Sequence, residues 1–168
     1  EAYGEYSRNL SALSLLKRFN NLAVLKTLSK AHALAGARIG SVIAAPELIA
    51  VLKACQAPYP ISKPSSELAV KAFASDHLAR SHDNIRACLD ERTRMQDALK
   101  QIPVVNTVFE SDANFLLVRF KEADAIAGYL LHRGIVVRVM RQYPAIADCL
   151  RISIGTEAEN LRFLEALD

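Results

Sequence analysis

The sequence has no tryptophan and few other aromatic residues, with five tyrosines and six phenylalanines among 168 residues. Aliphatic side chains and alanine must therefore fill the core, and a hydrophobic content of 51% is enough for one core or two small ones. No apolar stretch reaches the ~20 residues of a membrane-spanning helix. The first nine residues are polar and do not resemble a signal peptide. We therefore expect a cytoplasmic protein without a membrane partner.

Cysteine is scarce, with three residues far apart at Cys55, Cys88 and Cys149. Their odd number and wide spacing favour reduced, mostly buried thiols of the cytosol over disulfides. No histidine pairs with a cysteine, and the two closest histidines, His77 and His82, are five residues apart. Because that spacing does not place them on one helical face, we expect no metal site.

Acidic residues are absent between Tyr6 and Pro46. This window contains six fixed positive charges, at Arg8, Lys17, Arg18, Lys26, Lys30 and Arg38. The chain has a net charge of +3, so the remaining residues, with 15 basic and all 18 acidic side chains, sum to −3. A local positive field in an almost neutral protein predicts a small anionic ligand and no nucleic-acid partner.

Lys30 stands in this window between hydroxyl groups and an arginine. Thr27 and Ser29 precede it, and Arg38 follows eight positions later. Most lysines are solvated and, with a pKa of about 10.4, are poor nucleophiles at neutral pH. Apolar neighbours such as Leu28 favour loss of the proton, which allows a Schiff base to form with a carbonyl. Hydroxyls and a guanidinium can also bind a phosphate. A carbonyl-reactive lysine beside a phosphate site is the chemistry of pyridoxal phosphate.

Residues 27–40, Thr-Leu-Ser-Lys-Ala-His-Ala-Leu-Ala-Gly-Ala-Arg-Ile-Gly, resemble the cofactor-lysine motif of fold-type I aminotransferases, above all of the histidinol-phosphate aminotransferase family. His32 occupies a position where that family commonly has another aromatic ring. Further matches follow in order over nearly the whole chain, at residues 1–3, 57–60, 111–115, 134–138 and 150–156. The lysine motif indicates the cofactor class, and the ordered set indicates the subfamily.

The resemblance implies an α/β fold that corresponds to the C-terminal half of a fold-type I aminotransferase. Residues 1–76 would belong to the large cofactor-binding domain and keep a remnant of its sheet. Residues 77–168 would form the small C-terminal domain, opened by a long bridging helix. The aspartate that pairs with the pyridine nitrogen in the family would lie just before Glu1. The resemblance also implies a homodimer.

The same resemblance implies roles for the residues around the lysine. Lys30 would be catalytic: it would hold pyridoxal 5′-phosphate covalently and move the proton between substrate and cofactor. Tyr3 would hydrogen-bond the ring hydroxyl of the cofactor. Thr27, Ser29 and Arg38 would bind its phosphate.

Two arginines near the C-terminus are candidates for substrate binding. Arg151 alternates with Leu150 and Ile152 and so faces away from them, although an isolated strand arginine is usually a solvated edge charge. In the family the arginine of this Leu-Arg-Ile segment binds the anionic group of the substrate. The arginine at the position of Arg138 helps to bind the same group.

The resemblance implies a small-molecule reaction of histidine biosynthesis, transamination between L-histidinol phosphate and 2-oxoglutarate. One guanidinium would serve the phosphate and the carboxylate in turn. Another fold-type I enzyme, such as an aromatic aminotransferase or threonine-phosphate decarboxylase, stays open as an alternative. For the isolated 168-residue chain, an inactive folded fragment also stays open as an alternative.

Periodicity and capping signals predict the elements of the first half. We expect an amphipathic helix over 11–19, buried strands over 22–25 and 39–45, and a helix that begins at Pro46. Three prolines make residues 57–65 a loop, after which Ser65 or Ser66 caps a helix to about residue 74.

A long helix is predicted from Ser75 to a point before Pro103, with Arg92 among its solvated charges. Strands follow at 104–109, 115–120, 135–139 and 150–154. A helix over 122–133 ends at Gly134, and a capping box at residues 156–159 opens the last helix.

Overall fold

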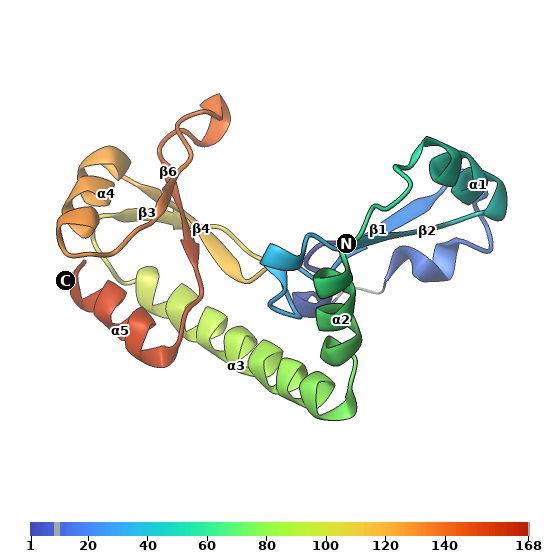
Figure 1. The fold of residues 1–168 in the computed structure, drawn as a ribbon. Coiled ribbons are helices and arrows are strands. Elements are labelled where there is room, and N and C mark those ends of the chain that lie inside the picture. Colours follow the sequence, from blue (N-terminus) through green and yellow to red (C-terminus); the bar gives the residue numbers. More distant parts are fainter. Residues whose placement is uncertain (9–10, 168) are drawn as a thin grey trace. The chain divides into compact units, whose positions relative to one another are not determined.

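The computed structural model describes residues 1–8 and 11–167. The chain divides into two compact units, residues 1–85 and 86–168, and the division falls within helix α3 (Ser75–Leu99) (Figure 1). The long helix that the sequence predicts is therefore present and belongs in part to each unit. The domain division after residue 76 stays a prediction.

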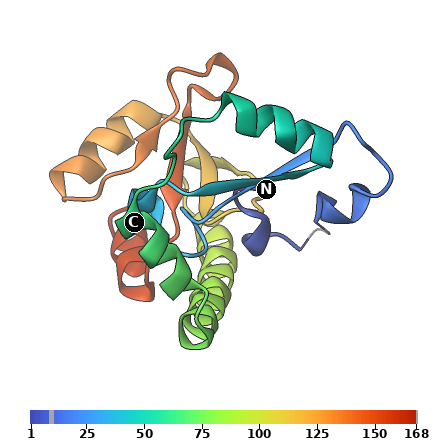
Figure 2. The same ribbon diagram turned by 45° about the vertical axis from the view of Figure 1, so that its right-hand side comes forward.

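The first unit contains a two-stranded antiparallel sheet. Strand β1 (Ala23–Thr27) pairs with β2 (Gly40–Ala44) along its whole length, with Thr27 opposite Gly40 at the open end of the connecting loop. Helix α1 (Pro46–Cys55) begins two residues after β2 and lies beside it (Figure 2). Pro46 opens α1 as predicted, because the first turn of a helix needs no N–H from that residue.

The two predicted strands are confirmed in position but only partly in burial. Val24 is 3% exposed, whereas Leu25 on the opposite face is 60% exposed and Val42 is 39% exposed. Side chains alternate between the two faces of a strand, so one face of this hairpin presents apolar side chains to solvent.

The helix predicted over residues 11–19 is wrong. Only a short 3-10 helix, η2 (Ala12–Leu15), forms there, with the hydroxyl of Ser11 accepting from the N–H of Leu13. Leu13 and Leu15 are exposed. A short amphipathic helix is marginal unless its apolar face packs on other residues, and these leucines are not packed in this unit.

Helix α2 (Lys63–Ala72) begins earlier than the sequence predicts. Its N-cap is Ser62, whose hydroxyl accepts from the N–H of Ser65 at 3.3 Å, so the predicted caps Ser65 and Ser66 lie inside the helix. Pro64 fits because it stands in the first turn. The helix contacts the short 3-10 helix η3 (Ala35–Ala37) of the β1–β2 loop.

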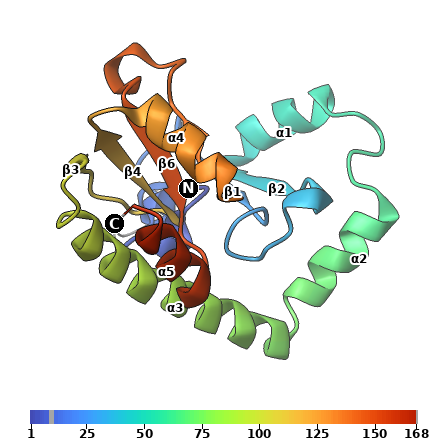
Figure 3. The ribbon, with the colours of Figure 1, turned by 90° about the vertical axis from the view of Figure 1, so that its left-hand side faces the viewer.

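The second unit is a four-stranded antiparallel sheet with helices on one face. The strand order is β3 (Val105–Val108), β4 (Phe115–Phe120), β6 (Cys149–Ser153) and β5 (Arg138–Val139). The helices are α3, α4 (Ala123–His132) and α5 (Glu157–Glu165) (Figure 3). The core joins one face of the sheet to all three helices: Met95, Leu99, Leu116, Val118, Phe120, Leu130, Leu150, Ile152 and Phe163. The other face of the sheet is free to carry polar groups.

Most predicted elements of this unit are confirmed, but the strand over 135–139 is shorter. Gly134 ends α4 in the left-handed conformation with φ +72°. The N–H groups of Gly134 and Ile135 donate to Leu131 O and Leu130 O, both at 2.9 Å. This Schellman motif uses the N–H of Ile135 for the helix end, and only Arg138 and Val139 pair with β6.

Two predictions about exposure are wrong. Arg92 is buried, with 9% of its surface exposed, and its guanidinium donates to Ala113 O at 2.7 Å. Among the cysteines, which are all free, Cys149 is buried but Cys55 is exposed. Within the described ranges, no helix is long and apolar enough to cross a membrane, and no cluster of three or more metal-ligating side chains occurs.

Candidate active site

Lys30 lies in the loop that connects β1 to β2, three residues after β1 ends. The N–H of Leu28 donates to Ile39 O at 3.1 Å, which extends the hairpin pairing by one residue beyond Thr27 and Gly40. The N–H of Ala33 donates to Lys30 O at 3.0 Å. The loop is therefore closed by its own backbone hydrogen bonds, and the hairpin register returns Arg38 towards the segment that follows β1.

The structure brings Thr27 and Ser29 together. The N–H of Ser29 donates to Thr27 Oγ1 at 3.1 Å, and the two hydroxyl oxygens lie 2.9 Å apart. Thr27 Oγ1 also lies 3.2 Å from Ile39 O. These contacts fix both hydroxyls at the end of β1, where the sequence predicts a phosphate site.

Tyr3 and Lys30 also lie close together. Lys30 Nζ is 5.4 Å from the centre of the Tyr3 ring, within the range of a cation–π contact. The described residues give the Lys30 amine no hydrogen bond and no ion pair, whereas Lys26 Nζ lies 3.4 Å from carboxylate oxygens of both Glu1 and Glu5. The charge of Lys26 is therefore neutralised, whereas the amine of Lys30 has no carboxylate partner among the described residues.

Glu1 is a residue of the site that the sequence did not single out for this role. Its carboxylate accepts from the hydroxyl of Ser11 at 2.8 Å and from the N–H of Ala12 at 2.6 Å, in addition to its ion pair with Lys26. The hydrogen bond from Ser11, followed by that from Ala12, lowers the pKa of Glu1. These contacts tie the segment that carries Tyr3 to strand β1.

Arg38 adopts the left-handed conformation, with φ +58°, as does Ala33 with φ +55°. For residues other than glycine this costs about 1 kcal/mol or more each, and such strain clusters at functional sites. The exposed guanidinium of Arg38 donates to Ala35 O at 3.1 Å, on its own side of the loop. The structure shows no contact between this guanidinium and the hydroxyls of Thr27 and Ser29.

The donor set of the loop fits a phosphorylated carbonyl compound. Two hydroxyls and a guanidinium are hydrogen-bond donors suited to phosphate oxygens, and the amine of Lys30 is suited to a carbonyl carbon. No carboxylate contacts any of these four side chains among the described residues, and the nearby carboxylates of Glu1 and Glu5 are paired with Lys26. Pyridoxal phosphate has both of the required groups.

In the second unit, Arg138 and Arg151 are directly opposite each other on β5 and β6. Like charges in this arrangement destabilise a sheet. Arg151 Nε is buried without a hydrogen-bond partner, and the guanidinium carbon lies 5.0 Å from the centre of the Phe115 ring. Neither arginine forms an ion pair with a described carboxylate. The pair retains its double charge and so offers a site for an anion.

The turn after β6 is held by Asn160, another residue that sequence analysis missed. Its side chain donates to Gly155 O at 3.1 Å and to a carboxylate oxygen of Glu91 at 2.7 Å, and it accepts from the N–H of Gly155 at 3.0 Å. A Cβ at Gly155 would come within 2.7 Å of Glu159 Oε2, so a side chain at this position would displace the Glu159 carboxylate. Asn160 thereby fixes the end of the strand that carries Arg151.

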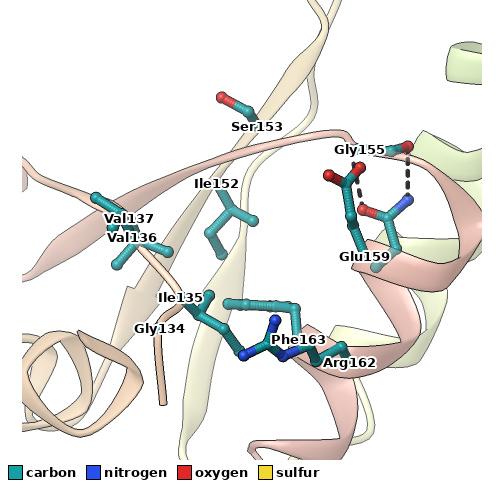
Figure 4. Close-up of a pocket in the computed structure, with 11 residues that line it drawn as sticks. Gly134, Ile135, Val136, Val137, Ile152, Ser153, Gly155, Glu159, Arg162 and Phe163 are labelled. Atoms are coloured by element: carbon teal, nitrogen blue, oxygen red, sulfur yellow. Dashed lines mark hydrogen bonds between the residues drawn. The ribbon is translucent and has the colours of Figure 1, made fainter. Parts of the chain in front are cut away.

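Two cavities lie near these residues without containing most of them. A cavity of about 310 Å³ is lined by Ser153, Glu159 and Arg162, together with residues 134–137 (Figure 4), but not by Arg138 or Arg151. In the first unit, Thr27 and His32 line a cavity of about 350 Å³ that does not include Lys30. Neither cavity encloses Lys30 or the two arginines.

Comparison with known proteins agrees with this arrangement. Residues 1–167 match the family model "Aminotransferase class I and II". The chain is 54% identical over 167 residues to a histidinol-phosphate aminotransferase of Stenotrophomonas maltophilia, which covers 99% of this chain and 46% of that protein. It thus spans about half the length of the curated relatives that it matches.

Solved structures show the same relationship. The histidinol-phosphate aminotransferase from Clostridium acetobutylicum superposes with a TM-score of 0.89 at 26% identity, over 99% of this chain and 51% of that one. The enzyme of that name from Sinorhizobium meliloti, solved with pyridoxal 5′-phosphate, gives 0.83 at 25% identity, over 99% and 46%. Enzymes of this family generally depend on pyridoxal phosphate. Because the family model matches residues 1–167 of the 168-residue chain, this chain belongs to the class I and II aminotransferases.

Proposed function

We propose that this chain is part of a pyridoxal-phosphate-dependent enzyme that transfers an amino group between L-histidinol phosphate and 2-oxoglutarate. The observation that carries the proposal is the amine of Lys30, which lies beside Tyr3 and has no carboxylate partner among the described residues. The 54% identical relative is named histidinol-phosphate aminotransferase. These are small-molecule substrates, and the proposal includes no nucleic-acid or membrane partner.

The residues around Lys30 would each have a separate role. Lys30 would hold the cofactor covalently until the substrate amine replaces it. Its neutral amine would then take the proton from the substrate Cα and deliver it to the cofactor. Thr27, Ser29 and Arg38 would donate hydrogen bonds to the phosphate, and the Tyr3 hydroxyl would donate to the ring oxygen. When bound, pyridoxal phosphate supplies the carbonyl for amine exchange and a ring that accepts electrons from the broken C–H bond.

Arg138 and Arg151 would bind the anionic end of each substrate. Guanidinium groups form paired hydrogen bonds with both phosphate and carboxylate, so one site can serve both half-reactions. The facing positive charges of the two arginines support this role, because a bound anion would relieve their repulsion. A protein of this kind would act as a homodimer in the cytoplasm, and the exposed apolar face of the β1–β2 hairpin supports association.

Chemical trapping tests the assignment of Lys30. The intact protein is incubated with pyridoxal phosphate, reduced with borohydride, digested and analysed by mass spectrometry. We expect the pyridoxyl group on the peptide that contains Lys30, and none in the Lys30→Ala variant. The Lys26→Ala variant is the control and should be labelled normally. Labelling of a different lysine would overturn the assignment.

A substrate panel distinguishes the alternatives. Release of CO₂ from L-threonine phosphate would favour a decarboxylase, and faster transfer from aromatic amino acids would favour an aromatic aminotransferase. Pyridoxal phosphate is also mixed with the isolated 168-residue chain. The absorbance of the cofactor should change if this chain can hold it, and should stay unchanged if the chain is an inactive fragment.

A further inference from the structure

The guanidinium of Arg151 contacts an aromatic ring and forms no ion pair with a described carboxylate. Its guanidinium carbon lies 5.0 Å from the centre of the Phe115 ring. Residues 117 and 151 are opposite each other on β4 and β6, as are 115 and 153, so Phe115 is a diagonal neighbour of Arg151 on the same face. A ring can orient a guanidinium by cation–π attraction without using its hydrogen-bond donors.

Arg119 shows the contrasting arrangement in the same sheet. Its guanidinium carbon lies 5.3 Å from the centre of the Phe109 ring, and its Nε lies 2.8 Å from the carboxylate of Asp148. The hydrogen bond from Arg119 lowers the pKa of Asp148, as expected for a formed ion pair. Arg119 is thus neutralised and structural, whereas Arg151 keeps its charge for a ligand.

The backbone turn that precedes Phe115 is held by a buried arginine. Arg92, on α3, donates to Ala113 O at 2.7 Å within the turn that precedes β4. In the same turn the Ser111 hydroxyl donates to Phe115 O at 2.6 Å and accepts from the N–H of Ala113 at 3.1 Å. The N–H of Ile154 donates to Asn114 O at 2.9 Å, which ties this turn to the end of β6. The backbone that presents Phe115 is therefore rigid.

We infer that Phe115 and Arg92 are positioning residues for the anion site of Arg151. Arg92 fixes the turn, the turn fixes Phe115, and the ring holds the guanidinium plane with its terminal nitrogens free for a phosphate or carboxylate. The inference rests on the proposed function, since it assumes that Arg151 binds the substrate.

The test measures anion binding and kinetics on the same variants of the intact protein. Inorganic phosphate is titrated by calorimetry into protein saturated with pyridoxal phosphate, so that the cofactor already occupies its own phosphate site. Phe115→Leu should weaken phosphate binding about three- to thirtyfold and raise KM for both substrates by a similar factor, with kcat nearly unchanged. Phe115→Tyr, which keeps the ring, should restore both values.

Matched variants separate positioning from general stability. Phe109→Leu removes the equivalent contact at Arg119 and should leave phosphate binding and KM unchanged. Arg92→Lys should weaken phosphate binding in the same direction as Phe115→Leu, and thermal unfolding shows which variants remain folded. Should Arg92→Lys fail to fold, Phe115→Leu and its tyrosine rescue decide the inference.

The outcomes distinguish this inference from the proposed function. If Arg151→Gln weakens phosphate binding but Phe115→Leu does not, the positioning role is wrong and the substrate site stands. If Phe109→Leu weakens binding as much as Phe115→Leu, the effect is structural and the inference fails. If Arg151→Gln itself leaves binding and KM unchanged, both the substrate site and the inference are overturned.

Discussion

Arg138 and Arg151 face each other across β5 and β6, and neither has a carboxylate partner among the described residues. Because the two charges repel, we predict that Arg138→Ala raises the free energy of unfolding by about 0.2–1 kcal/mol when no anion is present. The same change should weaken phosphate binding. Denaturant unfolding at low salt, with and without phosphate, measures both effects.

Arg141 provides the control for this prediction. It is also exposed, but it forms an ion pair with Asp124 at 2.6 Å. Arg141→Ala should therefore leave stability unchanged or lower it slightly, and should not affect phosphate binding. A loss of stability in Arg138→Ala without anion would contradict the view that the facing arginines are an unneutralised pair.

Arg38 is predicted to retain the cofactor. Arg38→Ala should weaken the binding of pyridoxal phosphate by about 1.5–3 kcal/mol, because a charge-assisted contact to its phosphate is lost. Arg18→Ala, in the same acid-free window but next to Phe19, is the matched control and should bind normally. Equilibrium dialysis measures both, and equal affinities for the two variants would place the phosphate elsewhere.

Glu91 is predicted to make stability depend on pH. Its carboxylate accepts from Arg94 and Asn160, and the hydrogen bond from Arg94, followed by that from Asn160, lowers its pKa from the ordinary value of 4.5. A carboxyl group with a lowered pKa stabilises the fold above its unfolded-state pKa, and this contribution is lost as the pH falls through the folded-state pKa. The wild type should therefore lose more stability below pH 4.5 than Glu91→Gln does.

Urea unfolding at a series of pH values from 7 down to 3 tests this prediction. At pH 7, Glu91→Gln should be less stable than the wild type by about 1–3 kcal/mol, because hydrogen bonds to a charged group are lost. Asp97→Asn removes an exposed carboxylate from the same helix and should change stability little. Parallel pH curves for wild type and Glu91→Gln would contradict the assigned role.

Gly155 and Gly128 are predicted to respond in opposite ways to alanine. At Gly155 an added Cβ would lie 2.7 Å from Glu159 Oε2, and displacing that carboxylate breaks the capping box with Thr156. Gly155→Ala should cost about 1–2 kcal/mol of stability. At Gly128, inside α4, nothing lies within 4 Å, so alanine should stabilise by about 0.5–1 kcal/mol. Thermal unfolding of both variants measures the difference, and destabilisation by Gly128→Ala would contradict it.

Local signals predicted much of the fold because the residues that carry them act locally. Pro46, Gly134 and the Thr156 capping box each define a helix end through contacts within a few residues, and all three are confirmed. The helix over residues 11–19 failed because amphipathic periodicity requires a surface to pack on, and sequence does not show whether one is present.

The sequence motif around Lys30 names the residues of the candidate site but does not give their geometry. The structure brings Thr27 to Ser29 and Tyr3 to Lys30, and it leaves Arg38 bonded to Ala35 O. Lys26 is neutralised by Glu1 and Glu5, which are at least 21 positions away in the sequence, so spacing along the chain did not indicate this pairing. Arg92 had a usable signal, because it recurs with Met95 and Leu99 at helical spacing on the buried face, although charged side chains on a helix are usually solvated.

The most direct test of the account is transamination by the intact protein with Lys30 replaced. Amino transfer from L-histidinol phosphate to 2-oxoglutarate is measured for the wild type, Lys30→Ala and Lys26→Ala, with circular dichroism as the check on folding. Lys30→Ala should stay folded and lose activity, while Lys26→Ala, which lacks only a lysine already paired with Glu1 and Glu5, should keep most of its activity. Near-normal turnover by folded Lys30→Ala protein would show that Lys30 is not the catalytic lysine.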